Sequence, residues 1–177
     1  MIYLFLADGF EEIEALGCVD ILRRAELEVS TVGVTGKTVT GAHGVKVEAD
    51  ILVSECSDDA EMVILPGGST GTNNLAASEA VASLVRSAAR RNAYVAAICA
   101  APTVLGGLGL LEGKRAVCYP GLEGRLTGAK RCDKRVCVDG NYITSRGPGT
   151  TAEFSLAIVE ILKDRAAAEK IRKGMLW

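Results

Sequence analysis

Several features that define common protein classes are missing from this 177-residue sequence. No stretch approaches the roughly 20 apolar residues that a membrane span needs, and Met1 leads into a strand-like run without a basic leader and cleavage site. The sequence also has no lysine- or arginine-rich run, and its net charge is only −2. These absences argue against a membrane or a nucleic acid as the main partner, and we expect a cytoplasmic protein.

Residues that bind metals or close disulfides are also few or scattered. His43 is the single histidine, and the six cysteines include no CxxC pair, so neither a zinc site nor a disulfide scaffold is supported. The glycine-rich stretch LPGGSTGTNNL at residues 65–75 lacks the lysine of a phosphate-binding GxxxxGK[ST] loop. The sequence therefore predicts a protein without a metal ion or another cofactor.

What the sequence does contain is an alternation of apolar, strand-like runs and amphipathic stretches, without a linker or repeat. The length suits one domain, residues 1–177. The alternation predicts a doubly wound α/β sandwich with a mostly parallel sheet. Strands are expected at residues 2–7, 28–34, 60–65, 94–98, 115–118, 136–138 and 142–144, a hairpin at 36–47, and helices at 11–25, 78–91, 100–107, from 150 onward and at 166–173.

Two short motifs predict local detail near the end of the chain. Asp139-Gly140-Asn141 is typical of a tight turn between two strands. Thr150-Thr151-Ala152-Glu153 has the spacing of a capping box, in which the first and last side chains cap the start of a helix.

The segment YVAAICAAP, residues 94–102, places Cys99 between a strand and a helix. Ligands of doubly wound sheets bind at the carboxyl ends of strands, which selects the loops at residues 7–10 and 66–71 together with Cys99. Small neighbours on both sides suit a nucleophile elbow, and a helix N-terminus favours a thiolate. The alternative is a buried cysteine that serves only as a small apolar side chain.

Three glutamates in DGFEEIEA, residues 8–15, begin the first predicted helix. They suit a solvated first turn, which is the ordinary interpretation. Helical spacing, however, turns Glu14 inward with Cys18 and sends Glu12 to the opposite side with Arg23. A buried carboxyl group has a raised pKa, so Glu14 is predicted to be protonated and to donate a hydrogen bond to Cys99.

The turn that contains Gly67 and Gly68 has two open interpretations. Its backbone N–H groups are placed to line a substrate site, where those of Gly68 and Ala100 would bind a developing oxyanion. Alternatively, it is a tight turn and nothing more. Of the remaining cysteines, only Cys118 is a candidate resolving thiol, with packing as the alternative, and the other four are interpreted as ordinary.

The chain resembles the ThiJ/PfpI superfamily, in the branch of the human parkinsonism-associated protein deglycase, through five ordered motifs: GFEEIEA, ILRRAELEV, VILPGG, AAICAAPTVLG and TSRGPGTTAEFSLAIVE. The resemblance implies a flavodoxin-like sandwich and a homodimer. It places the nucleophilic, oxidation-prone cysteine at Cys99, the protonated glutamate at Glu14, and the oxyanion-binding amides at Gly68 and Ala100. It also implies conversion of methylglyoxal to lactate without glutathione, disputed deglycation, or redox sensing through a cysteine sulfinate.

One part of the resemblance departs from the human branch. That branch has a histidine near its nucleophile, whereas the segment Cys118-Tyr119-Pro120-Gly121 offers Tyr119. The phenol is a poor base at pH 7, so a Cys-His-acid triad is not supported, and we expect Tyr119 to bind a substrate oxygen. His43 lies where relatives often carry an arginine that reaches a neighbouring subunit's site. The first hypothesis is a carbonyl-detoxifying cysteine enzyme, and the alternative is an oxidative-stress sensor or chaperone.

Overall fold

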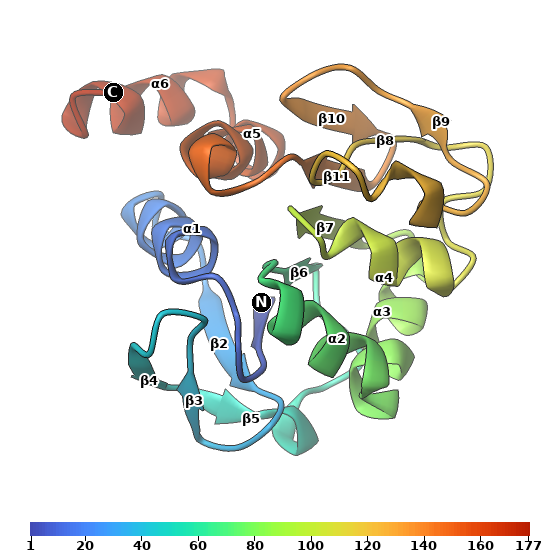
Figure 1. The fold of residues 1–177 in the computed structure, drawn as a ribbon. Coiled ribbons are helices and arrows are strands. Elements are labelled where there is room, and N and C mark those ends of the chain that lie inside the picture. The colour runs from blue at the N-terminus through green and yellow to red at the C-terminus, as the bar shows by residue number, and fades with distance from the viewer.

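A seven-stranded sheet forms the centre of the structure, a computed structural model that describes residues 1–177 (Figure 1). The strand order is β10-β11-β7-β6-β1-β2-β5, and all neighbours are parallel except β10 and β11. This confirms the predicted flavodoxin-like, doubly wound sandwich. The strands are β1 (Ile2–Leu6), β2 (Val29–Gly33), β5 (Ile51–Leu52), β6 (Met62–Leu65), β7 (Tyr94–Ile98), β10 (Val136–Asp139) and β11 (Tyr142–Ser145).

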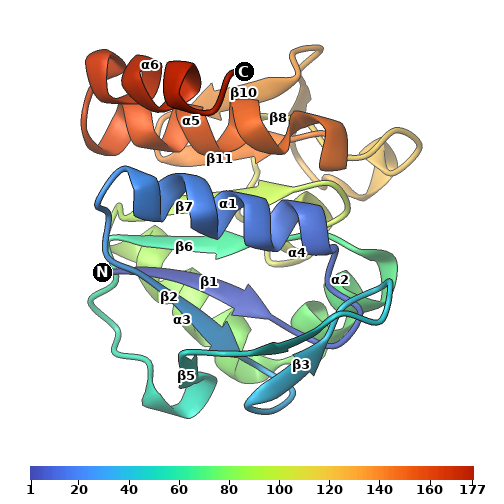
Figure 2. The ribbon, with the colours of Figure 1, turned by 90° about the vertical axis from the view of Figure 1, so that its left-hand side faces the viewer.

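Helices cover both faces of this sheet. Figure 2 looks onto the face that α1 and α5 cover, with α6 packed on α5, while Figure 1 shows α3 and α4 on the opposite face. None of the helices has both the length and the apolar content that crossing a membrane would demand. The helices are α1 (Glu12–Arg24), α2 (Ser69–Ala77), α3 (Glu79–Arg90), α4 (Pro102–Gly107), α5 (Thr151–Leu162) and α6 (Arg165–Gly174).

The side chains of the central strands alternate between two apolar clusters. In β1, Ile2, Leu4 and Leu6 pack into the cluster under α1 and α5, whereas Tyr3 and Phe5 pack into the cluster under α3 and α4. Successive side chains of a strand point to opposite faces, so a sheet covered on both sides requires apolar residues throughout. This is why the strands appear in the sequence as continuous apolar runs.

Two minor sheets lie beside the main one. The predicted hairpin consists of β3 (Thr38–Thr40) and β4 (Lys46–Glu48), which pair antiparallel. Strands β8 (Arg115–Ala116) and β9 (Lys130–Arg131) pair parallel. The strand predicted to reach residue 118 stops earlier, because the backbone N–H of Val117 donates to the side-chain hydroxyl of Thr144 instead of to a backbone carbonyl of a neighbouring strand.

The glycine-rich stretch after β6 is not only a turn, as the sequence suggested, because α2 begins directly after Gly68. The missed helix contains glycine and two asparagines, which have low helix propensity. Tertiary contacts compensate, since the backbone N–H of Gly71 donates to the carbonyl of Gly9 at 3.0 Å. The start of α1 and the start of α2 are therefore held against each other.

The predicted capping box at residues 150–153 is wrong, whereas the tight turn before β11 is confirmed. The hydroxyl of Thr150 donates to the carbonyl of Gly147 at 2.8 Å and pairs with the hydroxyl of Ser145, so it does not cap α5. The carboxylate of Glu153 accepts hydrogen bonds from Arg135 instead. Between β10 and β11, Gly140 has a φ of 57°, as a two-residue turn requires.

Candidate active site

The candidate site lies where β1, β6 and β7 end side by side. After β1 the chain adds β2 and β5 on one side of the sheet, and after β6 it adds β7 and β11 on the other side. Such a switch in strand order leaves a crevice at the carboxyl edge of a sheet. A cavity of about 560 Å³ opens there, and Cys99, Gly68, Ala100 and Tyr119 all line it. Four of the residues predicted from the sequence therefore surround one space.

Cys99 occupies the sharp turn between β7 and α4 with a φ of 65°, a left-handed conformation that is uncommon for a residue with a side chain. Two hydrogen bonds hold this backbone. The N–H of Cys99 donates to the carbonyl of Ser145 at 3.0 Å, and the carbonyl of Cys99 accepts from the N–H of Tyr119 at 2.7 Å. This geometry is that of a nucleophile elbow, in which local strain holds a side chain at the mouth of a site.

Glu14 projects inward from the first turn of α1 and is fully buried. Its Oε2 accepts a hydrogen bond from the backbone N–H of Gly67 at 2.7 Å, while Oε1 is buried without a partner. Burial raises the pKa of this carboxyl group to about 7, although contacts with Cys99 and Gly67 lower it. Glu14 can therefore gain or release a proton beside Cys99 near neutral pH.

The two glycines after β6 are required by close approach. A Cβ atom at Gly67 would lie 2.5 Å from the Cβ of Cys99 and 2.6 Å from Oε2 of Glu14, so a larger residue would displace both side chains. Gly68 has a φ of 90°, and a Cβ there would collide with the backbone of Gly9. The backbone N–H groups of Gly68 and Ala100 both donate toward the Cys99 sulfur.

The helix after Cys99 contributes less to thiolate formation than the sequence suggested. Helix α4 begins at Pro102, not at Ala100, and has only six residues, so its dipole is short. Burial, followed by the negative charge of Glu14, raises the pKa of Cys99 to about 12, while the amides of Gly68 and Ala100 lower it. The thiolate is therefore favoured only when Glu14 carries the proton, because the repulsion between the two charges is then removed.

The cavity also contains residues that the sequence analysis missed. Glu11 and Arg125 line it, and Arg125 is the only basic side chain among its lining residues. Thr72 lines it as well, and its buried hydroxyl has no hydrogen-bond partner. The position of Glu11, next to the predicted loop at residues 7–10, was a usable signal, whereas nothing in the sequence near Arg125 marks that residue.

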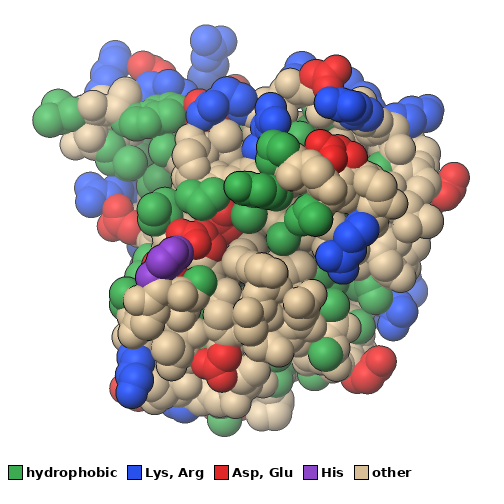
Figure 3. All heavy atoms as spheres, in the orientation of Figure 1, with side chains coloured by type: hydrophobic (Ala, Val, Ile, Leu, Met, Phe, Trp, Pro, Cys, Tyr) green, Lys and Arg blue, Asp and Glu red, His purple; other side chains and the backbone are tan.

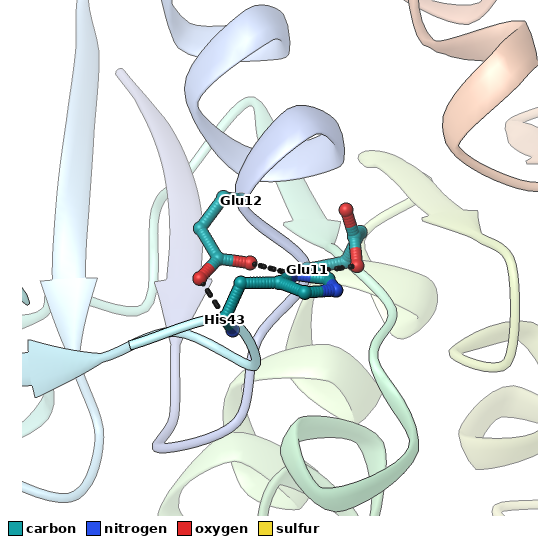
Figure 4. A group of neighbouring side chains, drawn as sticks. All are labelled: Glu11, Glu12 and His43. Carbon is teal, nitrogen blue, oxygen red and sulfur yellow. Dashed lines mark hydrogen bonds and ion pairs between the residues drawn. The ribbon is translucent and has the colours of Figure 1, made fainter. Parts of the chain in front are cut away.

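His43 does not line this cavity within one chain. It lies in the turn between β3 and β4, where its backbone N–H and its Nδ1 contact the two carboxylate oxygens of Glu12 at 2.7 and 2.8 Å. The Nδ1 atom is also 3.7 Å from the carboxylate of Glu11, so the imidazole lies between the two acids (Figure 4). The predicted contact of His43 with substrate, and the homodimer, stay predictions.

The side chain of Glu12 is not solvated, contrary to the ordinary interpretation of the first turn. The hairpin of β3 and β4 covers it, while Arg23 on the same helix pairs with Asp50. Burial opposes ionisation, but the hydrogen bonds from His43 prevail and lower the pKa of Glu12, and the same contact raises the pKa of His43. On the surface, the histidine lies beside acidic side chains and near a group of apolar ones (Figure 3).

Comparisons with known proteins find one family and many related structures. A family profile described as the DJ-1/PfpI family matches residues 1–161. The Drosophila melanogaster "Protein dj-1beta" is 40% identical over 98% of this chain and 95% of its own length. "Protein DJ-1 homolog B" of Arabidopsis thaliana is also 40% identical, over 97% of this chain, but this chain spans only 40% of that protein.

Two further matches bear on chemistry. The Caenorhabditis elegans protein named "Glutathione-independent glyoxalase DJR-1.2" is 33% identical over 93% of this chain and 89% of its own length. The structure described as "Toxoplasma gondii DJ-1, oxidized" superposes with a TM-score of 0.96 at 35% identity and covers 99% of this chain and 97% of its own. Similarity to both therefore extends over the whole candidate site.

Proposed function

Because the chain belongs to the DJ-1/PfpI family, we propose that it is a cysteine enzyme that converts a small 2-oxoaldehyde such as methylglyoxal to the 2-hydroxy acid without glutathione. The observation that carries the proposal is the convergence of the Glu14 carboxyl group and the amides of Gly68 and Ala100 on the Cys99 sulfur. The glyoxalase name of the similar Caenorhabditis elegans protein also supports it.

The first step is addition of the Cys99 sulfur to the aldehyde carbon. The C=O π electrons move to the oxygen, and the resulting oxyanion is held by the N–H groups of Gly68 and Ala100, which are in place before the substrate arrives. Glu14 takes the thiol proton when ionised and returns it to the oxyanion, which gives a neutral hemithioacetal. A carboxyl group with a pKa of about 7 is suited to both transfers.

The second step moves a proton between the two carbons of the adduct. Glu14 removes the proton from the former aldehyde carbon and delivers it to the neighbouring carbon, while the hydroxyl proton of the adduct moves to the neighbouring oxygen, which produces a thioester of the 2-hydroxy acid. Water then attacks the thioester, the C–S bond breaks, and Cys99 regains its proton. The sum is methylglyoxal plus water to lactic acid, so no external oxidant or reductant is consumed.

Other cavity residues are placed to orient the substrate. Tyr119, which is 49% exposed, offers its hydroxyl to a substrate oxygen, and the guanidinium of Arg125 suits the carboxylate of the product. In the hemiaminal that an aldehyde forms with an amine, the Cys99 sulfur would bond to the same carbon, the C–N bond would break, and the amine would leave with the thiol proton, which gives the same hemithioacetal and is the deglycation reaction. We therefore expect the same residues to act on the free aldehyde and on its adduct with an amine.

The direct test is to supply the purified protein with methylglyoxal in the absence of glutathione. We expect lactate to accumulate with each methylglyoxal consumed, at a rate proportional to the protein concentration. Lactate and methylglyoxal are quantified separately by chromatography or NMR. Loss of methylglyoxal without formation of lactate would indicate simple trapping by surface amines and would contradict the proposal.

A second candidate function is redox sensing, and the oxidised state of the similar Toxoplasma gondii protein favours it. Peroxide would oxidise Cys99 first to the sulfenic acid and then to the sulfinic acid, with one oxygen atom from each peroxide and one water released each time. A protonated Glu14 beside the sulfur would donate a hydrogen bond to the sulfinate. No dedicated carbonyl substrate is needed for this function.

Mild treatment with hydrogen peroxide tests this second function. We expect peptide mapping to place a gain of two oxygen atoms on Cys99, because that thiol lies in an open cavity beside Glu14. Cys18 is a matched internal control, since it is fully buried, and burial raises its pKa to about 12. Oxidation spread evenly over the cysteines would count against a sensing role for Cys99.

A further inference from the structure

A second group of cysteines lies away from the candidate site, beside the edge strand of the sheet. Cys132 and Cys137 are both free and buried, and together with Val117 they form a small apolar cluster separate from the two main ones. The sequence predicts no role for either cysteine, because they are five positions apart and match no metal-binding or redox spacing. Their proximity arises from the fold.

The backbone on both sides fixes the two thiols. Cys137 lies in β10 directly opposite Thr144 of β11, and its side chain is 2% exposed. Cys132 follows β9, and its backbone N–H donates to the carbonyl of Ala116 at 3.0 Å. Val117, whose N–H donates to the hydroxyl of Thr144, lies in the same cluster, so one thiol comes from the main sheet and the other from the β8–β9 sheet.

The two thiols lie together in this small cluster. Burial, followed by the adjoining Cys132 thiol, raises the pKa of Cys137 to about 12. Two neighbouring thiols are the arrangement from which a disulfide forms once one of them is oxidised.

Cys132 is the thiol of the pair that a small reagent can reach. It lines a cavity of about 70 Å³, which is room for roughly two water molecules and hence for one molecule of hydrogen peroxide. Cys137 does not line this cavity, so Cys132 is positioned to react first.

We propose that Cys132 and Cys137 form a reversible dithiol pair that hydrogen peroxide converts to a disulfide. The Cys132 thiolate attacks one peroxide oxygen, the O–O bond breaks, and a sulfenic acid and water result. The Cys137 sulfur then attacks the Cys132 sulfur, the S–O bond breaks, and the hydroxyl leaves as water with the Cys137 proton. Two thiols and one peroxide thus give one disulfide and two waters.

Cys118 is the competing partner, because it lines the same cavity as Cys132. Its thiol, however, donates to the carbonyl of Tyr119 at 3.4 Å, and its side chain belongs to the main apolar cluster under α3 and α4. Cys137, by contrast, shares the small cluster with Cys132. The geometry therefore favours the Cys132–Cys137 bond over a Cys118–Cys132 bond.

Peptide mapping can identify the bond directly, because trypsin cuts after Arg131, Lys134, Arg135 and Arg146. The full-length protein is treated with hydrogen peroxide, its remaining thiols are blocked with N-ethylmaleimide, and it is digested without reductant. We expect peptide 132–134 to be joined to peptide 136–146, with a mass about 2 Da below the sum of the two. Dithiothreitol should separate them into the unmodified peptides.

Matched variants complete the test. Cys132→Ser and Cys137→Ser should each abolish the joined species, whereas Cys56→Ser should leave it unchanged, because Cys56 lies in a different part of the fold. Cys99→Ala should also leave it unchanged, which separates this pair from the proposed function. A bond from Cys132 to Cys118, or complete blocking of Cys132 and Cys137 by N-ethylmaleimide after peroxide, would overturn the proposal.

Discussion

Cys99→Ala should lower the kcat/KM for methylglyoxal by roughly 10³-fold or more, which is the largest effect that we expect from any single substitution. The sulfur is the atom that bonds to the aldehyde carbon, and no other thiol lines the cavity. Initial rates of lactate formation over a range of methylglyoxal concentrations provide the measurement.

The fold should tolerate this substitution. Alanine and cysteine both carry a Cβ, so the cost of a φ of 65° at residue 99 is nearly the same for the two. Circular dichroism and the Tm serve as checks, and Cys56→Ala is a matched control because Cys56 lies outside the cavity. A Cys99→Ala protein that still forms lactate at a substantial rate would exclude Cys99 as the nucleophile.

Glu14→Gln should lower kcat by about 10²- to 10³-fold while leaving the reactivity of Cys99 nearly unchanged. The amide is close in shape to the carboxylic acid and keeps an N–H donor beside the sulfur, but it cannot take up or release a proton. Turnover of methylglyoxal and the rate of Cys99 labelling by iodoacetamide should therefore separate. A merely structural role for Glu14 predicts that both rates fall together.

The pH dependence sharpens this second prediction. Burial raises the pKa of Glu14 to about 7, so the protonated form is lost as the pH rises through 7 and the ionised form is lost as it falls below 7. The first step of the proposed mechanism needs ionised Glu14 to take the thiol proton, so turnover by the wild-type protein should fall as the pH drops through 7 and level off above it. The residual turnover of Glu14→Gln should lack the inflection, and an unchanged profile would show that another group titrates.

The central sheet and the nucleophile were predictable from sequence because each depends on local pattern. Residues 94–98 form an apolar run that is buried on both faces, and Cys99 ends it, so its place at the carboxyl edge follows from topology alone. The inward direction of Glu14 follows from helical spacing, and its complete burial agrees with that spacing. The positions of Gly68 and Ala100 were predictable as well, because these residues lie just after the ends of β6 and β7.

Other features depend on contacts between distant segments, which no local pattern encodes. The hairpin that folds over Glu12 comes from residues 38–48, so helical spacing alone could not show that His43 covers that carboxylate. Helix α2 exists because Gly9 and Gly71 meet, despite a sequence of low helix propensity. Arg125 reaches the cavity from a segment without regular pattern, and Cys132 meets Cys137 across two sheets.

The two backbone hydrogen bonds at Cys99 have a consequence for how the site responds to charge. Ser145 holds the N–H of Cys99 and Tyr119 holds its carbonyl, from opposite sides of the turn. When the sulfur ionises, bonds to carbon or gains oxygen, neither contact has to break, and the amides of Gly68 and Ala100 already point at the atom that changes. The polypeptide therefore contributes little to the reorganisation energy of each step, which is left to the substrate and the surrounding water.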